Sequence, residues 1–146
     1  MSPTSAVSHL FAVMPSRDTR AAASWYATLF GRPSDEEVGD EIIWEISETA
    51  WFVLAPHAEH AGHGIATLAV HDLDGVLERL RTYEEETATA AGAAGSEQYL
   101  VETYGNGVRH IAVRDPDGNS LALAEEPTPE EPTPEEPTPE RIADEV

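Results

Sequence analysis

The stretch HIAVRDPDGNSLALAEE, residues 110–126, decides how the C-terminal half of the chain folds. Its possible calcium-binding oxygens fall at positions 1, 3, 5 and 12 of an EF-hand spacing, on Asp115, Asp117, Asn119 and Glu126. An EF-hand also needs Gly at position 6, where this chain has Ser120, and helices on both sides, where this chain has strand-like segments. Pro116 and Gly118 instead favour a type I turn closed by a left-handed residue. The stretch therefore predicts a β-hairpin rather than a calcium site.

A strand, a helix and three further strands are predicted in the first half of the chain. The apolar residues of SHLFAVM, residues 8–14, indicate a strand, and Asp18 follows as a helix N-cap. Gly31 is placed to end that helix, and Pro33 prevents its continuation. Between these signals, apolar residues recur at helical spacing at Ala22, Trp25, Tyr26, Leu29 and Phe30. Short strands are then expected at 35–39, 41–47 and 50–55.

The same order of elements recurs in the second half. GIATLAV, residues 64–70, predicts a strand, and Asp72 is a second candidate N-cap. One face of the helix that follows carries Leu73, Val76, Leu77 and Leu80. Three more strands are expected near 97–103, 108–114 and 119–125. The sequence therefore predicts an α+β fold made of two βαβββ modules, at about 8–56 and 64–125.

A proline-rich acidic repeat, EEPTPEEPTPEEPTPE, occupies most of residues 126–146. Proline removes backbone donors and the glutamates repel one another, so this segment cannot build a core. We expect a disordered, extended tail after a single domain that spans residues 1–125. A solvating role is favoured for the tail, with partner docking as the alternative.

The formal net charge of −20 is spread along the chain. Residues 126–146 hold eight of the 28 acidic residues, but the remainder is also acidic and contains only seven arginines and no lysine. This charge argues against nucleic-acid binding and favours a cationic small molecule. No apolar run approaches the ~20 residues of a membrane span, no signal peptide is evident, and cysteine is absent. We therefore expect a cytoplasmic protein without disulfides that does not bind membranes.

Three segments carry a family resemblance: MPSRDTRAAASWYATLFGRP at 14–33, LAVHDLDGVLERLR at 68–81 and YGNGVRHIAVRDPDGNSLALAEE at 104–126. In order and spacing they resemble the vicinal oxygen chelate superfamily, which includes glyoxalase I, bleomycin-resistance proteins and extradiol dioxygenases. The resemblance implies that each module is a curved sheet with its helix on the convex face. It also implies that the concave faces form a ligand cavity, often across a homodimer, which is the assembly we expect.

The resemblance further implies four metal-ligand positions, on the first and last strands of the two modules, where metal-dependent members carry His or Glu. In this sequence those positions correspond to Phe11, Val53, Ile65 and Ala122. A shift of two residues keeps the same strand face and brings in His9 and His63, but it supplies no carboxylate. An open catalytic metal site typically needs three protein ligands. We therefore predict no metal, no cofactor and no catalytic residue in the cavity.

Histidines elsewhere in the chain offer alternative candidate sites. His57, His60 and His63 recur every three residues, and Glu59 stands among them. The proline and glycines around them favour an irregular, solvated linker without a fixed geometry. His110 can act as a general acid or base, but a single histidine on a strand is interpreted as a packing residue.

The side chains left for the cavity are mostly apolar and aromatic. A composition of this kind, with a few polar groups, is typical of small-molecule sites. The predicted ligand-binding residues are His9, Phe11, Trp44, Trp51, Val53, Ile65, Thr67, His110 and Ala122, with Ser120 adding polar character. Trp44 and Trp51 can equally belong to the hydrophobic core.

Three functional hypotheses follow. The leading one is a metal-free protein, similar to bleomycin-resistance proteins, that binds and sequesters a drug or metabolite, with affinity from aromatic stacking and apolar burial. The second is a glyoxalase-like lyase, isomerase or dioxygenase, which would depend on a metal ion. The third is a protein-interaction module with a vestigial cavity, whose repeated tail docks a partner.

Overall fold

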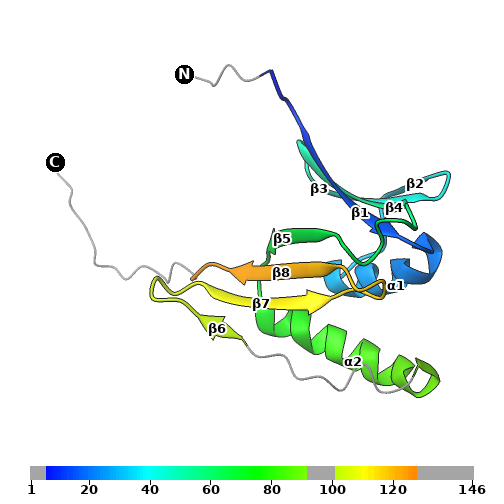
Figure 1. Cartoon of the computed structure of the whole chain (residues 1–146). Coiled ribbons are helices and arrows are strands. Elements are labelled where there is room, and N and C mark those ends of the chain that lie inside the picture. The colour runs from blue at the N-terminus through cyan, green and yellow to red at the C-terminus, as the bar shows by residue number, and fades with distance from the viewer. Residues whose placement is uncertain (1–5, 92–100, 128–146) are drawn as a thin grey trace.

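The computed structural model describes residues 6–91 and 101–127. Two four-stranded sheets and two helices make up this part of the chain, as Figure 1 shows. The first sheet contains, in spatial order, β1 (Leu10–Ser16), β4 (Ala50–Pro56), β3 (Glu41–Ser47) and β2 (Glu36–Val38). The second contains β5 (Ile65–Ala69), β8 (Ser120–Glu125), β7 (Arg109–Arg114) and β6 (Glu102–Thr103). The helices are α1 (Thr19–Phe30) and α2 (Leu73–Ala91).

The two modules have identical topology, which confirms the predicted α+β fold with a repeated βαβββ unit. In each module the first strand pairs in parallel with the last one, β1 with β4 and β5 with β8. The remaining neighbours are antiparallel. Parallel pairing of the first and last strands brings together two segments that are about 40 to 55 residues apart in sequence, which only a crossover through the helix allows. Of the strand predicted at 97–103, residues 97–100 lie outside the described residues, as does nearly all of the predicted disordered tail.

Both helices begin where the sequence predicts. Asp18 is the N-cap of α1, and its side chain accepts a hydrogen bond from the Ala21 amide at 3.1 Å. Gly31 ends this helix in the left-handed region, with φ of 79°. Asp72 caps α2 by accepting from the Gly75 amide at 3.1 Å. None of the described helices is long and apolar enough to cross a membrane.

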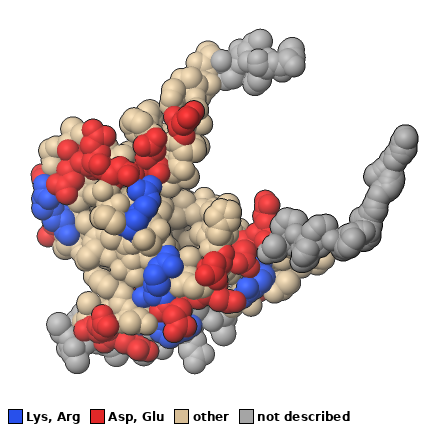
Figure 2. All heavy atoms as spheres, turned by 180° about the vertical axis from the view of Figure 1, so that it is seen from behind, with Lys and Arg blue, Asp and Glu red and all other residues tan. Residues whose placement is uncertain are grey.

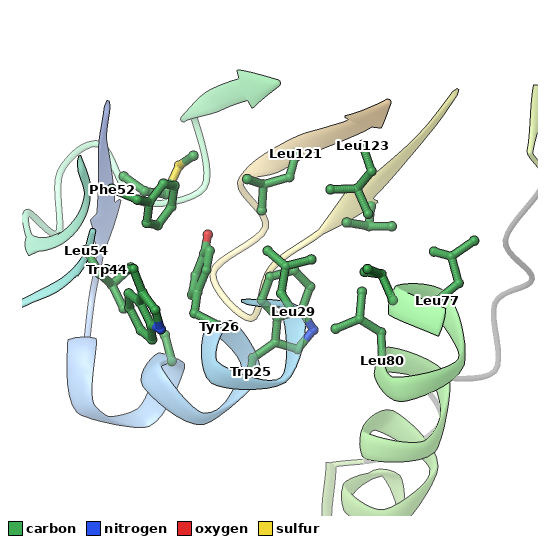
Figure 3. Close-up of a cluster of buried hydrophobic side chains, with 14 of the residues drawn as sticks. Trp25, Tyr26, Leu29, Trp44, Phe52, Leu54, Leu77, Leu80, Leu121 and Leu123 are labelled. Carbon is green, nitrogen blue, oxygen red and sulfur yellow. The ribbon is translucent and has the colours of Figure 1, made fainter. Parts of the chain in front are cut away.

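One hydrophobic core serves both modules. Tyr26 of α1 lies between side chains of the first sheet and side chains of the second module, as Figure 3 shows. The core residues of the first sheet include Trp44, Phe52 and Leu54, and those of the second module include Leu77, Leu80, Leu121 and Leu123. The two helices also pack directly against each other. The modules are therefore parts of one folded unit rather than two separate domains.

The hairpin predicted from RDPDGNS is present and joins the modules. The Gly118 amide donates to the Asp115 carbonyl at 2.9 Å, and Gly118 has a φ of 95°, as the turn requires. The side-chain oxygens of Asp115 accept hydrogen bonds from the Asp117 and Asn119 amides, from the Asn119 side chain and from the Tyr26 hydroxyl. Both carboxylate oxygens of Asp115, the first position of the EF-hand spacing, are thus engaged by protein donors.

Candidate functional site

Each sheet has one face packed on the helices and one face that points away from them, which we call the open face. Alternation along β1 leaves Phe11 and Val13 on the open face, where they are 51% and 59% exposed. Trp51 and Val53 of β4 are their register partners. The residues predicted on β1 and β4 therefore share one surface.

Aromatic rings dominate the open face of the first module. The rings of Phe11 and Trp51 meet edge to face, with 5.2 Å between centroids. His9, just before β1, lies nearly parallel to Phe11 at 6.5 Å. Within the described part of the chain the Trp51 Nε1 is buried without a hydrogen-bond partner. Glu45 of β3 pairs in register with Trp51, so its side chain leaves the sheet on the same face.

Small side chains characterise the open face of the second module. Thr67 and Ala122 are register partners on β5 and β8. Ile65 stands two residues before Thr67 and is 82% exposed. His110 on β7 stacks on Tyr104, with 5.5 Å between ring centroids and planes 25° apart. This surface therefore combines small side chains on β5 and β8 with one aromatic pair, Tyr104 and His110.

Trp44 does not belong to this surface, which corrects the prediction that it lines the cavity. It is 1% exposed, its ring stacks on Phe30 at 5.2 Å, and its Nε1 donates to the Arg32 carbonyl at 3.0 Å. Three consecutive residues of β3 at this point are apolar and buried, so alternation gave no signal for which face Trp44 takes. Ile43, the register partner of Val53, lies on the open face instead.

Acidic side chains form several groups on the surface seen in Figure 2, with arginines between them. Within the described residues, ion pairs with carboxylates involve Arg17, Arg20, Arg32 and Arg109. A hydrogen bond from Arg109 lowers the pKa of Asp74, and one from Arg32 lowers the pKa of Asp35. Much of the limited positive charge is thereby neutralised locally, which leaves a field that attracts cations.

One solved structure has a similar fold, and the match covers almost the whole length of that structure. No model of a known protein family matches the chain, and no curated protein matches it. The glyoxalase/bleomycin resistance protein from Catenulispora acidiphila DSM 44928 is 36% identical, with a TM-score of 0.63, over 82% of this chain and 98% of that one. The chain belongs to the glyoxalase/bleomycin resistance protein family.

Two further solved structures have the same fold. A bleomycin-binding protein in complex with bleomycin is 19% identical, with a TM-score of 0.56, over 82% of this chain and 97% of that one. Lactoylglutathione lyase from Agrobacterium tumefaciens is 17% identical, with a TM-score of 0.56, over 86% of this chain and 96% of that one. At these identities the two structures show the fold of the glyoxalase/bleomycin resistance family and nothing finer.

The four metal-ligand positions implied by the family resemblance all lie on the open faces of the two sheets, two positions on each sheet. They hold Phe11, Val53, Ile65 and Ala122, and none of these side chains has an atom that can ligate a metal. His9 and His63 stand just before β1 and β5, respectively, outside both strands. The described residues contain no group of three or more His, Asp or Glu side chains placed to hold a metal ion. The donor set therefore does not fit the metal of the metal-dependent members.

Sequence reasoning left several of the described open-face residues out of the candidate site, among them Glu45 and Tyr104. Glu45 lies two residues after Ile43 and therefore on the same face of β3. The sequence alone does not show whether Ile43 or Trp44 faces outward, so it does not show that Glu45 does. Tyr104 is brought back toward His110 by a turn in which its amide donates to the Val108 carbonyl at 2.8 Å. No sequence signal predicts that the two rings stack.

Proposed function

We propose that this family member binds and sequesters a bulky, largely apolar small molecule on its open face, without a metal ion. The observation that carries the proposal is the Phe11–Trp51 pair, which is aromatic and partly exposed. Aromatic rings supply stacking area at low entropic cost. Binding through such a surface requires no catalytic residue.

A cationic ligand suits this surface best. Glu45 stands beside Trp51 in register, and the whole chain carries a formal net charge of −20. A cation on an aromatic face is attracted by the ring, and a nearby carboxylate adds to that attraction. The bleomycin bound to the similarly folded bleomycin-binding protein is a natural first probe.

We also propose that two copies pair through their open faces, so that the ligand is enclosed between modules of different chains. In the single chain the apolar side chains of Val13 and Ile65 are 59% and 82% exposed. Apolar side chains this exposed on the open faces of both sheets favour an interaction there. Analytical ultracentrifugation should give the mass of a dimer for the wild type. An Ile65→Glu variant should shift toward the monomer, and an unchanged dimer would place the interface elsewhere.

Tryptophan fluorescence tests the ligand site directly. Titration with bleomycin, and then with other cationic aromatic compounds, should quench part of the emission in a saturable way. Trp51→Phe should remove that response and weaken binding about tenfold or more. Trp44→Phe is the matched control, because Trp44 lies in the core, and it should retain the response. Absence of saturable binding for every cationic probe would contradict the proposal.

Metal analysis separates this proposal from the metal-dependent enzymes of the family. Untagged protein, incubated with Zn²⁺, Mn²⁺ or Fe²⁺ and then dialysed, should retain no metal that depends on His9 or His63. A stoichiometric ion that is lost on His9→Ala or His63→Ala would overturn the metal-free proposal and indicate an enzyme.

A further inference from the structure

The linker between the two modules is held by backbone hydrogen bonds and has a defined shape. The His57 amide donates to the Ser16 carbonyl at 2.9 Å, and the His60 amide donates to the His57 carbonyl at 3.2 Å. Ala61, which follows, is buried. Farther along, the Gly62 amide donates to the Asn119 side-chain oxygen at 2.8 Å. The positions of the two histidines are therefore set by contacts on both sides of them.

The imidazoles of His57 and His60 approach each other through the same ring nitrogen. Their Nδ1 atoms are 2.9 Å apart, the ring centroids are 4.4 Å apart, and the ring planes differ by 61°. Two nitrogens joined head-on by a hydrogen bond at this separation would hold the ring centroids about 5 Å apart. The shorter centroid distance means that the two rings do not meet head-on, and it is compatible with nitrogen lone pairs that point toward a common site.

A metal ion ligated by both rings would give similar distances. Two nitrogens at about 2.05 Å from one ion, at a right angle, are about 2.9 Å apart, and their ring centroids are about 4.5 Å apart. The tetrahedral angle preferred by zinc would separate the nitrogens by about 3.3 Å. The observed 2.9 Å therefore matches the right angle found in square-planar and octahedral complexes of Cu²⁺ and Ni²⁺.

We propose that His57 and His60 form a two-histidine chelate for Cu²⁺ or Ni²⁺, in which each imidazole ligates through Nδ1. Both side chains are exposed, so an ion reaches them from solvent without any rearrangement of the core. The described part of the chain places no third His, Asp or Glu in a group with them, so water completes the coordination. This chelate is distinct from the open face and independent of the function proposed for it.

The chelate is tested by titrating the full-length, untagged protein with CuSO₄ in a non-chelating buffer. Calorimetry and electron paramagnetic resonance monitor the titration. We expect one ion per chain and a spectrum that reports two nitrogen donors. His57→Ala and His60→Ala should each weaken Cu²⁺ binding by at least about 10-fold, the lower end of the loss seen when even an outer-sphere partner of a metal ligand is removed. Both variants should unfold at the wild-type temperature in metal-free buffer.

His63→Ala is the matched control, because it removes an exposed histidine from the same linker and should leave Cu²⁺ affinity unchanged. Equal affinity for the wild type, His57→Ala and His60→Ala would overturn the proposal and leave a hydrogen-bonded histidine pair. A loss of Cu²⁺ affinity confined to His63→Ala would also overturn the proposal. A Zn²⁺ affinity higher than the Cu²⁺ affinity would do the same.

Discussion

Asn119 shows how much of this fold depends on one side chain. It is fully buried, and its Oδ1 accepts from the Gly62 and Gly64 amides, both at 2.8 Å. Its Nδ2 donates to the Pro15 carbonyl and to the Asp115 carboxylate, both also at 2.8 Å. One amide thus connects the end of β1, the linker and the β7–β8 hairpin. Every hydrogen-bonding position that an amide side chain offers is used.

Asn119→Ala should lower the free energy of unfolding by about 3 kcal/mol or more, because each buried polar group left without a partner costs about 1–3 kcal/mol. Urea-induced unfolding measures the loss. Asn106→Ala is the matched control in the β6–β7 hairpin, where an exposed side chain accepts from the Val108 amide at 3.1 Å. Its cost should stay below about 1 kcal/mol. Equal costs for the two variants would show that the buried network contributes little.

Tyr26 makes stability sensitive to alkaline pH. Burial, and then the neighbouring Asp115 carboxylate, raise the pKa of its hydroxyl above the ordinary value near 10. A raised folded-state pKa contributes stability that is complete below pH 10 and is lost as the pH rises, because the unfolded chain then ionises first. By pH 11 the wild type should lose about 1.4 kcal/mol that Tyr26→Phe does not lose. Denaturant unfolding at pH 8 and pH 11 measures both losses, and equal losses would exclude this role for Tyr26.

The helix α1 illustrates how local signals act at the scale of an element. Its N-cap, its left-handed C-terminal glycine and its apolar stripe all lie within 14 residues, from Asp18 to Gly31. Its buried side chains include Trp25, Tyr26 and Leu29, which face both sheets and the other helix. The element therefore forms from local sequence, but it is the packing of its apolar face that stabilises it.

Asp18→Ala should destabilise the protein by about 1 kcal/mol, because the Ala21 amide loses its side-chain acceptor. Asp18→Asn keeps an oxygen in place and should stay within a few tenths of a kcal/mol of the wild type. Guanidinium unfolding curves with equal slopes would allow the two midpoints to be compared directly. A cost for Asn as large as that for Ala would indicate that charge, rather than the cap, is what matters.

At the scale of the whole molecule, one hydrophobic core joins the two modules, and we expect them to unfold as one cooperative unit. Leu29 of α1 is buried where the helices meet, and its carbonyl accepts from Arg79 of α2 at 3.1 Å. Arg17 and Asp117 also connect the modules, through an ion pair. Neither sheet has a core of its own that excludes the other module.

Leu29→Ala should cost about 2–5 kcal/mol and should weaken both modules equally. Hydrogen exchange of backbone amides measures this, because the protection of β4 and of β8 should fall by the same free energy. Leu10→Ala removes the same atoms from a position that is 68% exposed, and it should leave protection in both strands nearly unchanged. A fall confined to β4 would mean that the modules unfold separately.

The sequence by itself determined the features that depend on neighbours in the chain. These are the N-caps at Asp18 and Asp72, the hairpin around Gly118 and the order of the βαβββ modules, because capping, turn geometry and periodicity act over a few residues. Alternation along β1 also grouped Phe11 with Val13 on one face of the strand.

Only the tertiary structure decided which side of β3 carries Trp44, since both faces of that strand are apolar there. Only it revealed that the Trp51 Nε1 is buried without a partner among residues 6–91 and 101–127, that Asn119 joins three segments, and that His57 and His60 meet through Nδ1. These features depend on the positions of atoms that packing brings together, sometimes across more than 100 residues of chain. Local propensity carries no information about such contacts, because they form only when the whole core is assembled.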